Sequence, residues 1–70
     1  MDKYYINNRQ QDNGDYEVHK AGCSYFPRED YMYLGEFYIC TGAVLEAKRR
    51  FPNRHRINGC YYCSNACHTS

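Results

Sequence analysis

Three segments of the chain show the alternation of apolar and polar side chains, or the enrichment in tyrosine and isoleucine, that is typical of strands. They are residues 3–7, 15–19 and 31–39. Residues 8–14 are polar and end in Asn-Gly, which favours a turn, so we expect the first two strands to pair as antiparallel neighbours. Gly35 lies within the third segment and predicts a bend there.

A helical period follows over residues 42–51. Thr41 is expected to be the N-cap, because its hydroxyl can accept a hydrogen bond from an amide of the first turn. Pro52 ends the helix. Residues 53–58 are expected to form a basic loop, and residues 65–70 a short tail with room for one helical turn. The apolar side chains at helical spacing, which predict the buried stripe, are Ala43, Val44, Ala47 and Phe51.

These elements predict a single α+β domain over residues 1–70, with about three antiparallel strands, one main helix and a core in roughly residues 16–63. A chain of this length buries only about 60% of its unfolded surface, so its apolar core alone gives marginal stability. A disulfide or a bound metal ion is therefore expected to stabilise the fold. No segment has the apolar length of a signal peptide or of a membrane span of roughly 20 residues. We therefore expect a cytoplasmic protein without membrane contact, whose five cysteines are available as thiols.

Four residues of types that bind metal ions form two short pairs. His19 and Cys23 lie near the front of the chain, and Cys60 and Cys63 lie near its end. Two ligands from each of two distant segments are typical of a closed tetrahedral zinc site, in which thiolates and a neutral imidazole fill all four positions. The sequence therefore predicts a zinc ion that joins the two ends of the fold.

Other ligand sets stay open at this level. Cys67 and His68 could join Cys60 and Cys63 in a C-terminal site, or either could replace His19 in the long-range site. Cys40 is expected to be a small buried residue at the helix start, and the alternative is a thiol activated by the helix N-terminus. A disulfide between Cys40 and Cys67 is also conceivable after oxidation, but spacing alone cannot place their Cα atoms within bridging range.

The charge pattern suggests a binding surface. The net charge is only +1, yet basic side chains crowd into residues 48–56. Phosphate contacts from this stretch and stacking by nearby tyrosines would suit nucleic acid. Tyrosine and arginine are equally typical of protein interfaces, so a regulatory module that contacts a larger host protein is the second hypothesis. The candidate binding residues are Lys48, Arg49, Arg50, Arg54, Arg56, Tyr61 and Tyr62.

An enzyme is not expected. A catalytic zinc keeps one position open for water, whereas the four predicted ligands close the shell. The chain has no glycine-rich phosphate loop, nucleophile elbow or HExxH motif. The acidic neighbours Asp15 and Glu17 are interpreted as surface residues. We expect a macromolecular partner and no small-molecule substrate.

The order HxxxC, a central strand, a helix with AxxxA, and GCxxC resembles the Ada-type metal-binding domain of bacterial methyl-accepting DNA-repair regulators and some nucleases. The resemblance covers roughly residues 16–63 and implies a zinc-bearing α+β module that works with DNA. In the repair protein the first ligand is a cysteine that accepts a methyl group; here His19 takes its place, so no methyl acceptance is expected. The chain also resembles short bacterial and prophage-type reading frames that begin with GDxEVHxxxC and end with GCxYCxxxCHTS.

Overall fold

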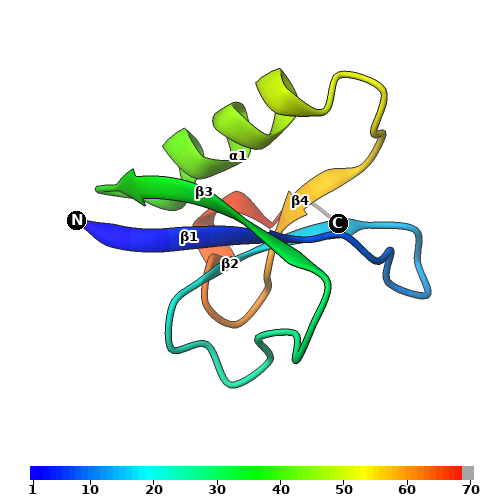
Figure 1. The fold of residues 1–70 in the computed structure, drawn as a ribbon. Coiled ribbons are helices and arrows are strands. Elements are labelled where there is room, and N and C mark those ends of the chain that lie inside the picture. The colour runs from blue at the N-terminus through cyan, green and yellow to red at the C-terminus, as the bar shows by residue number, and fades with distance from the viewer. Residues whose placement is uncertain (69–70) are drawn as a thin grey trace.

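The computed structural model describes residues 1–68 and shows an α+β fold, as predicted. Residues 69–70, which belong to the predicted tail, lie outside the described residues. Four strands, one α-helix and one short 3-10 helix follow one another (Figure 1). In chain order they are β1 (Asp2–Asn7), β2 (Tyr16–Lys20), β3 (Tyr31–Phe37), α1 (Cys40–Arg50), β4 (Ile57–Gly59) and η1 (Asn65–Cys67).

The strands form one mixed sheet in the order β3-β1-β2-β4. β1 pairs antiparallel with β2, which confirms the predicted pairing of the first two strands, and it also pairs antiparallel with β3. β4 pairs parallel with β2, with Val18 opposite Gly59. This strand was not predicted, because most of it lies in residues 53–58, where a basic loop was expected. A strand of three residues is too short to show alternation, and its three residues are all buried.

The third strand carries the predicted bend. Tyr4 pairs with Gly35 and Tyr5 pairs with Tyr33, so Leu34 is an extra residue in the ladder between β1 and β3. Gly35 has a φ of +130°, which residues with a Cβ rarely adopt. The strand ends at Phe37 and does not continue to residue 39.

Helix α1 packs against one face of the sheet (Figure 1). Its buried face is formed by Cys40, Ala43 and Ala47, and the predicted Val44 and Phe51 pack against the core while partly exposed. The helix begins at Cys40, so the predicted N-cap is wrong: Ile39 holds that position and makes no side-chain cap. Cys40 lies three residues before Ala43 on the same helical face, and burying it extends the helix through Thr41. The sheet contributes Tyr4, Ile6, Val18 and Leu34 to this core.

The C-terminal turn is fastened to the helix and to the sheet. A disulfide joins Cys40 to Cys67, with the two Cα atoms 6.2 Å apart. The turn also lies directly on β4, since a Cβ added to Gly59 would come within 2.7 Å of both the Cys67 Cβ and the Ser64 carbonyl oxygen. Close packing of this kind requires glycine, and it fixes where the chain leaves β4.

Candidate metal centre

The parallel pairing of β2 and β4 brings the two ligand pairs together. Strands that run in the same direction end at the same edge of a sheet, so the chain segments that follow them start side by side. His19 lies near the end of β2, and Cys60 immediately follows β4. The Cys60 amide donates to the Val18 carbonyl oxygen at 2.9 Å, which continues the ladder into the second ligand pair. The sheet therefore positions both halves of the site.

The four predicted ligands form one compact cluster. The ligand atoms of His19, Cys23, Cys60 and Cys63 all lie within 4.8 Å of one another. The Cys23 and Cys60 Sγ atoms are 3.9 Å apart, and the Cys63 Sγ atom is 3.8 Å from His19 Nδ1. Sulfurs bound at about 2.3 Å from a single zinc ion lie about 3.8 Å apart in a tetrahedron. The spacing of the side chains therefore fits a four-coordinate metal ion at their centre.

Backbone amides point at two of the sulfur atoms. The Lys20 amide donates to the Cys63 Sγ atom at 3.3 Å, and the Tyr25 amide donates to the Cys23 Sγ atom at 3.4 Å. Gly22 has a φ of +87° just before Cys23, in agreement with the tight knuckle that its position predicts. Hydrogen bonds of this kind stabilise a thiolate more than a thiol. The two loops are therefore shaped for charged sulfur ligands.

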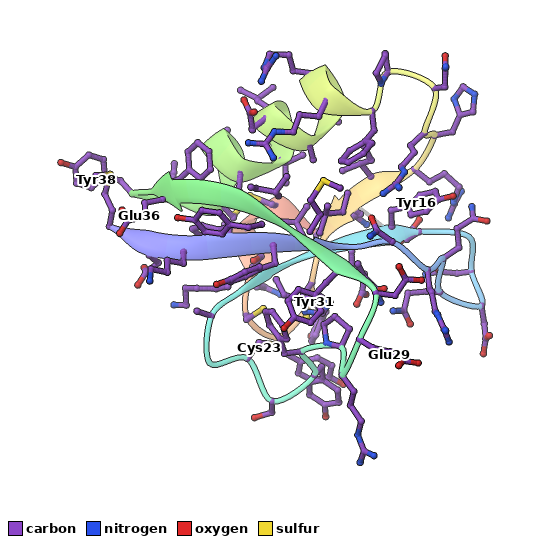
Figure 2. The ribbon with its side chains drawn as sticks, in the orientation of Figure 1. Tyr16, Cys23, Glu29, Tyr31, Glu36 and Tyr38 are labelled. Atoms are coloured by element: carbon purple, nitrogen blue, oxygen red, sulfur yellow. A yellow bond between two sulfur atoms is a disulfide. The ribbon has the colours of Figure 1, made fainter. Side chains whose placement is uncertain are left out.

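His19 is presented to the cluster by the sheet face that lies away from α1. Its Cα partner across the ladder is Tyr5, while the neighbouring Ile6 and Val18 belong to the core under the helix. Successive strand residues point to opposite faces, so His19 lies on the side of the sheet where Cys23 is found (Figure 2). The imidazole is 1% exposed, and the ring of Phe26 packs 6.0 Å from it, centroid to centroid.

Glu17 lies behind the imidazole. Its Oε1 atom is 3.4 Å from His19 Nε2, a buried nitrogen that has no hydrogen-bond partner among the described residues. A histidine that binds metal through one nitrogen usually donates its other N–H to a carboxylate, which fixes the tautomer and orients the ring. Glu17 is in place for this role. Burial, followed by the nearby Asp15 carboxylate, raises the pKa of Glu17, and His68 opposes the shift.

The interpretation of Asp15 and Glu17 as surface residues is wrong for Asp15, which is 2% exposed and pairs with Arg56 at 3.0 Å. The Glu17 side chain is 20% exposed. The sequence held a signal for Glu17: residues 17 and 19 lie two apart on a strand and so share one face.

Without a metal, burial raises the pKa of the Cys60 thiol and of the Cys63 thiol. Burial lowers the pKa of His19 to about 4. At neutral pH the metal-free cluster therefore holds protonated Cys60 and Cys63 thiols and a neutral imidazole. A cation that binds must displace protons from sulfur, whereas the imidazole is already in the form that binds metal.

The alternative ligand sets are not the ones that the structure assembles. Cys67 is joined to Cys40 in the disulfide, and the His68 Nδ1 atom lies 3.0 Å from the Gly59 carbonyl oxygen. Cys40 is buried, as the simplest interpretation held, but it is not a free thiol. Spacing left the disulfide open because the contact depends on how the turn after β4 folds back onto α1.

The predicted binding residues are divided between two regions. Tyr61 and Tyr62 lie between the two cysteine ligands of the second pair, and the Tyr62 ring stacks on Tyr25 with centroids 4.0 Å apart. Tyr25 belongs to the 21–30 loop, which Figure 1 shows on the side of the sheet away from α1. Tyr25, Tyr61 and Tyr62 are each more than half exposed, and we call them the knuckle tyrosines. Tyr25 was not among the predicted binding residues, because only the fold brings it next to Tyr62.

The basic candidates lie on or just after α1, and most of them are engaged within the molecule. Arg49 and Arg50 both donate to the Glu46 carboxylate, and these hydrogen bonds lower the pKa of Glu46 to about 2. Arg50 also donates to the carbonyl oxygens of Tyr33 and Leu34 in β3. A further ion pair joins Arg56 to Asp15, as described above. Lys48 and Arg54 have no carboxylate partner within residues 1–68.

Comparison of the chain with models of protein families, with curated proteins and with solved structures finds no match. The resemblance to the Ada-type domain stays a prediction. Within residues 1–68, no helix has the length and apolarity needed to cross a bilayer.

Acid is expected to destabilise the fold through His19. Its folded pKa of about 4 lies below the ordinary value of 6.5, so between these values the unfolded chain binds the proton more tightly. This contribution to stability is complete above about pH 6.5 and is lost as pH falls to 4, which amounts to about 3 kcal/mol. Urea unfolding of metal-free protein with the Cys40–Cys67 disulfide intact measures this loss across the same pH range. His55 is an exposed histidine, so His55→Gln should keep the same decrease of unfolding free energy with falling pH. If the decrease disappeared in this variant, His55 and not His19 would be its source.

Glu17→Gln is expected to weaken metal binding about tenfold while the fold is retained, because an amide accepts the imidazole N–H less strongly than a carboxylate does. Competition with a chromophoric chelator gives the affinity. Glu36→Gln is the matched control, since Glu36 is an exposed glutamate in β3. Equal affinities in the two variants would remove Glu17 from the site.

Proposed function

We propose that this protein is a small module with a structural zinc ion, that it catalyses no reaction, and that it acts by binding a macromolecule. The observation that carries the proposal is the cluster of His19, Cys23, Cys60 and Cys63, with all ligand atoms within 4.8 Å of one another. Three sulfurs and one imidazole suit zinc, which accepts such sets in tetrahedral geometry. Four protein ligands leave no position for water, and this supports a structural role.

Metal content and proton release test the zinc assignment together. Native mass spectrometry of protein purified under reducing conditions should show one zinc ion per chain. Titration of metal-free protein with zinc at pH 7 should release two or more protons per ion, because the Cys60 and Cys63 thiols are protonated beforehand. A reduced protein that is natively folded without metal, or zinc binding without proton release, would refute the proposal.

The knuckle tyrosines favour a protein partner over nucleic acid. Exposed tyrosines are enriched where proteins bind one another, since each ring offers a large contact area with little conformational entropy to lose. Three of the five basic candidates are held in ion pairs with Glu46 or Asp15, and they would have to leave these carboxylates to contact phosphates. The cation density that nucleic-acid binding requires is therefore reduced.

Titration with labelled single-stranded and double-stranded oligonucleotides at 50 and 200 mM salt distinguishes the two partner classes. We expect no saturable binding. Micromolar affinity that falls steeply with salt would transfer the proposal to nucleic acid, because release of counterions from phosphates produces that dependence.

The cytoplasmic location also stays a proposal. Three free cysteines shaped for metal suit a reducing compartment, whereas the disulfide between Cys40 and Cys67 is typical of an oxidising one. Alkylation of the protein in freshly lysed cells, followed by mass spectrometry, counts the thiols. Alkylation of both Cys40 and Cys67 would support the cytoplasm, and an intact disulfide would oppose it.

A further inference from the structure

A hollow of about 410 Å³ lies beside the end of α1, and its lining is basic. No acidic side chain lines it. The volume is within the range of small-ligand pockets in proteins. The cationic or ionisable residues that line it are Lys48, Arg54, His55 and Arg56, and the apolar ones include Phe51 and Ile57.

Arg54 is held in one position. Its guanidinium carbon lies 4.0 Å from the centroid of the Phe51 ring and 4.7 Å from that of Tyr16, so two aromatic rings pack against it. Its Nη1 atom donates to the Asn8 side-chain oxygen at 3.1 Å. Figure 2 shows Tyr16 at the end of the sheet near the loop that follows α1. A guanidinium that is already immobilised loses little entropy when it binds an anion.

The charge of Arg54 is not neutralised within the described chain. The residue is half-buried, and its contacts are the two rings and the neutral Asn8. A partly buried cation on an apolar surface has lost some of its hydration, and an anion would restore the lost interaction. A solvated basic surface, the simpler explanation of this stretch, would leave the arginine extended and exposed.

Lys48 adds a second cation that has no carboxylate partner within residues 1–68. Arg56 adds less uncompensated positive charge to the hollow, because it already pairs with Asp15. Arg56 has a φ of +63°, and its side chain passes over Gly14, where an added Cβ would lie 3.3 Å from the Arg56 Nε atom. The surplus around the hollow is therefore about two positive charges.

We propose that the hollow binds a phosphomonoester dianion. Two uncompensated cations match a phosphate group with two negative charges, and the planar fork of Arg54 suits its oxygens. The negative end of the α1 dipole opposes an anion here, but only by fractions of a kcal/mol at an exposed helix end. The site lies apart from the metal ligands and does not depend on the proposed zinc ion. The phosphate could belong to a free small molecule or to a phosphorylated side chain of a partner.

Chemical-shift titration of the ¹⁵N-labelled, metal-loaded protein with inorganic phosphate tests the proposal, with sodium chloride at equal ionic strength as the reference. Saturable shifts confined to residues 48–57 and neighbours of the hollow are expected. Arg54→Gln should weaken binding at least tenfold, whereas Arg28→Gln makes the same change of charge on the exposed 21–30 loop and should leave binding unchanged.

Because Arg54 also packs against two rings, its replacement could disturb the fold. Lys48→Gln removes an exposed cation without a packing role and should also weaken phosphate binding severalfold. Shifts that chloride reproduces, or equal affinities in the Arg28, Lys48 and Arg54 variants, would overturn the proposal.

Tighter binding of a phosphoserine peptide than of phosphate would identify a protein source, and tighter binding of a nucleoside monophosphate would identify a small-molecule source. Either result supports the dianion site.

Discussion

Removal of the metal at neutral pH is expected to unfold this protein. Structural zinc contributes on the order of 10–16 kcal/mol of apparent binding free energy in small domains, and a domain of this size is otherwise only marginally stable. The loop that supplies Cys23 is only partly packed against the rest of the fold, since Ala21, Gly22 and Ser24 are exposed. Circular dichroism during titration with a strong chelator should show cooperative loss of structure, and added zinc should restore it.

The Cys40–Cys67 disulfide complicates this experiment because it also stabilises the fold. It closes a loop across a sequence separation of 27, which corresponds to about 3.5 kcal/mol in the loop-entropy model. Chelation should therefore be carried out with and without reductant. Complete unfolding is expected with reductant and a destabilised fold is expected without it. A reduced, metal-free chain that kept native ellipticity would show that the metal is not structural.

Replacement of Cys60 by serine is expected to abolish metal binding and to unfold the reduced chain. Cys60 is 1% exposed, and its Sγ atom lies 3.9 Å from that of Cys23. Serine supplies a weak, protonated ligand in place of a thiolate, and three remaining ligands bind zinc far less tightly. Inductively coupled plasma spectrometry of purified variants gives the metal content, and thermal unfolding gives the stability.

Cys40→Ser is the matched control, because it changes a buried cysteine in the same way without touching the cluster. It should remove the disulfide and lower stability by about 3.5 kcal/mol in oxidised protein, with one metal ion per chain retained. Equal metal loss in the two variants would show that the ligand set is wrong.

Much of the metal centre could be predicted because its chemistry is local. His19 lies only a few residues before Cys23, as Cys60 does before Cys63, and few residue types bind zinc. The two pairs could be matched without knowing the path between them, since a tetrahedral ion needs both. The buried face of α1 could be predicted in the same way, because Ala43 and Ala47 lie one helical turn apart.

The roles of Tyr25 and Arg54 could not be predicted in the same way. Each depends on a contact between distant segments: Tyr25 with Tyr62 from the other knuckle, and Arg54 with the rings of Phe51, which follows α1, and of Tyr16 in β2. Glu17 shares β2 with His19, but the strand pattern alone does not show that its carboxylate lies next to the imidazole Nε2 atom. Charge counting placed Arg49, Arg50 and Arg56 on a binding surface, whereas the fold supplies them with internal carboxylates.

The sequence by itself determined the α+β class, the helix and the four candidate metal ligands, because periodicity and ligand chemistry act over a few residues. Only the tertiary structure decided that β4 runs parallel to β2, that Cys67 bonds to Cys40, and that the basic stretch is largely paired. These features follow from packing between residues far apart in the chain. Their energies depend on burial and distance, which no local pattern of residues encodes.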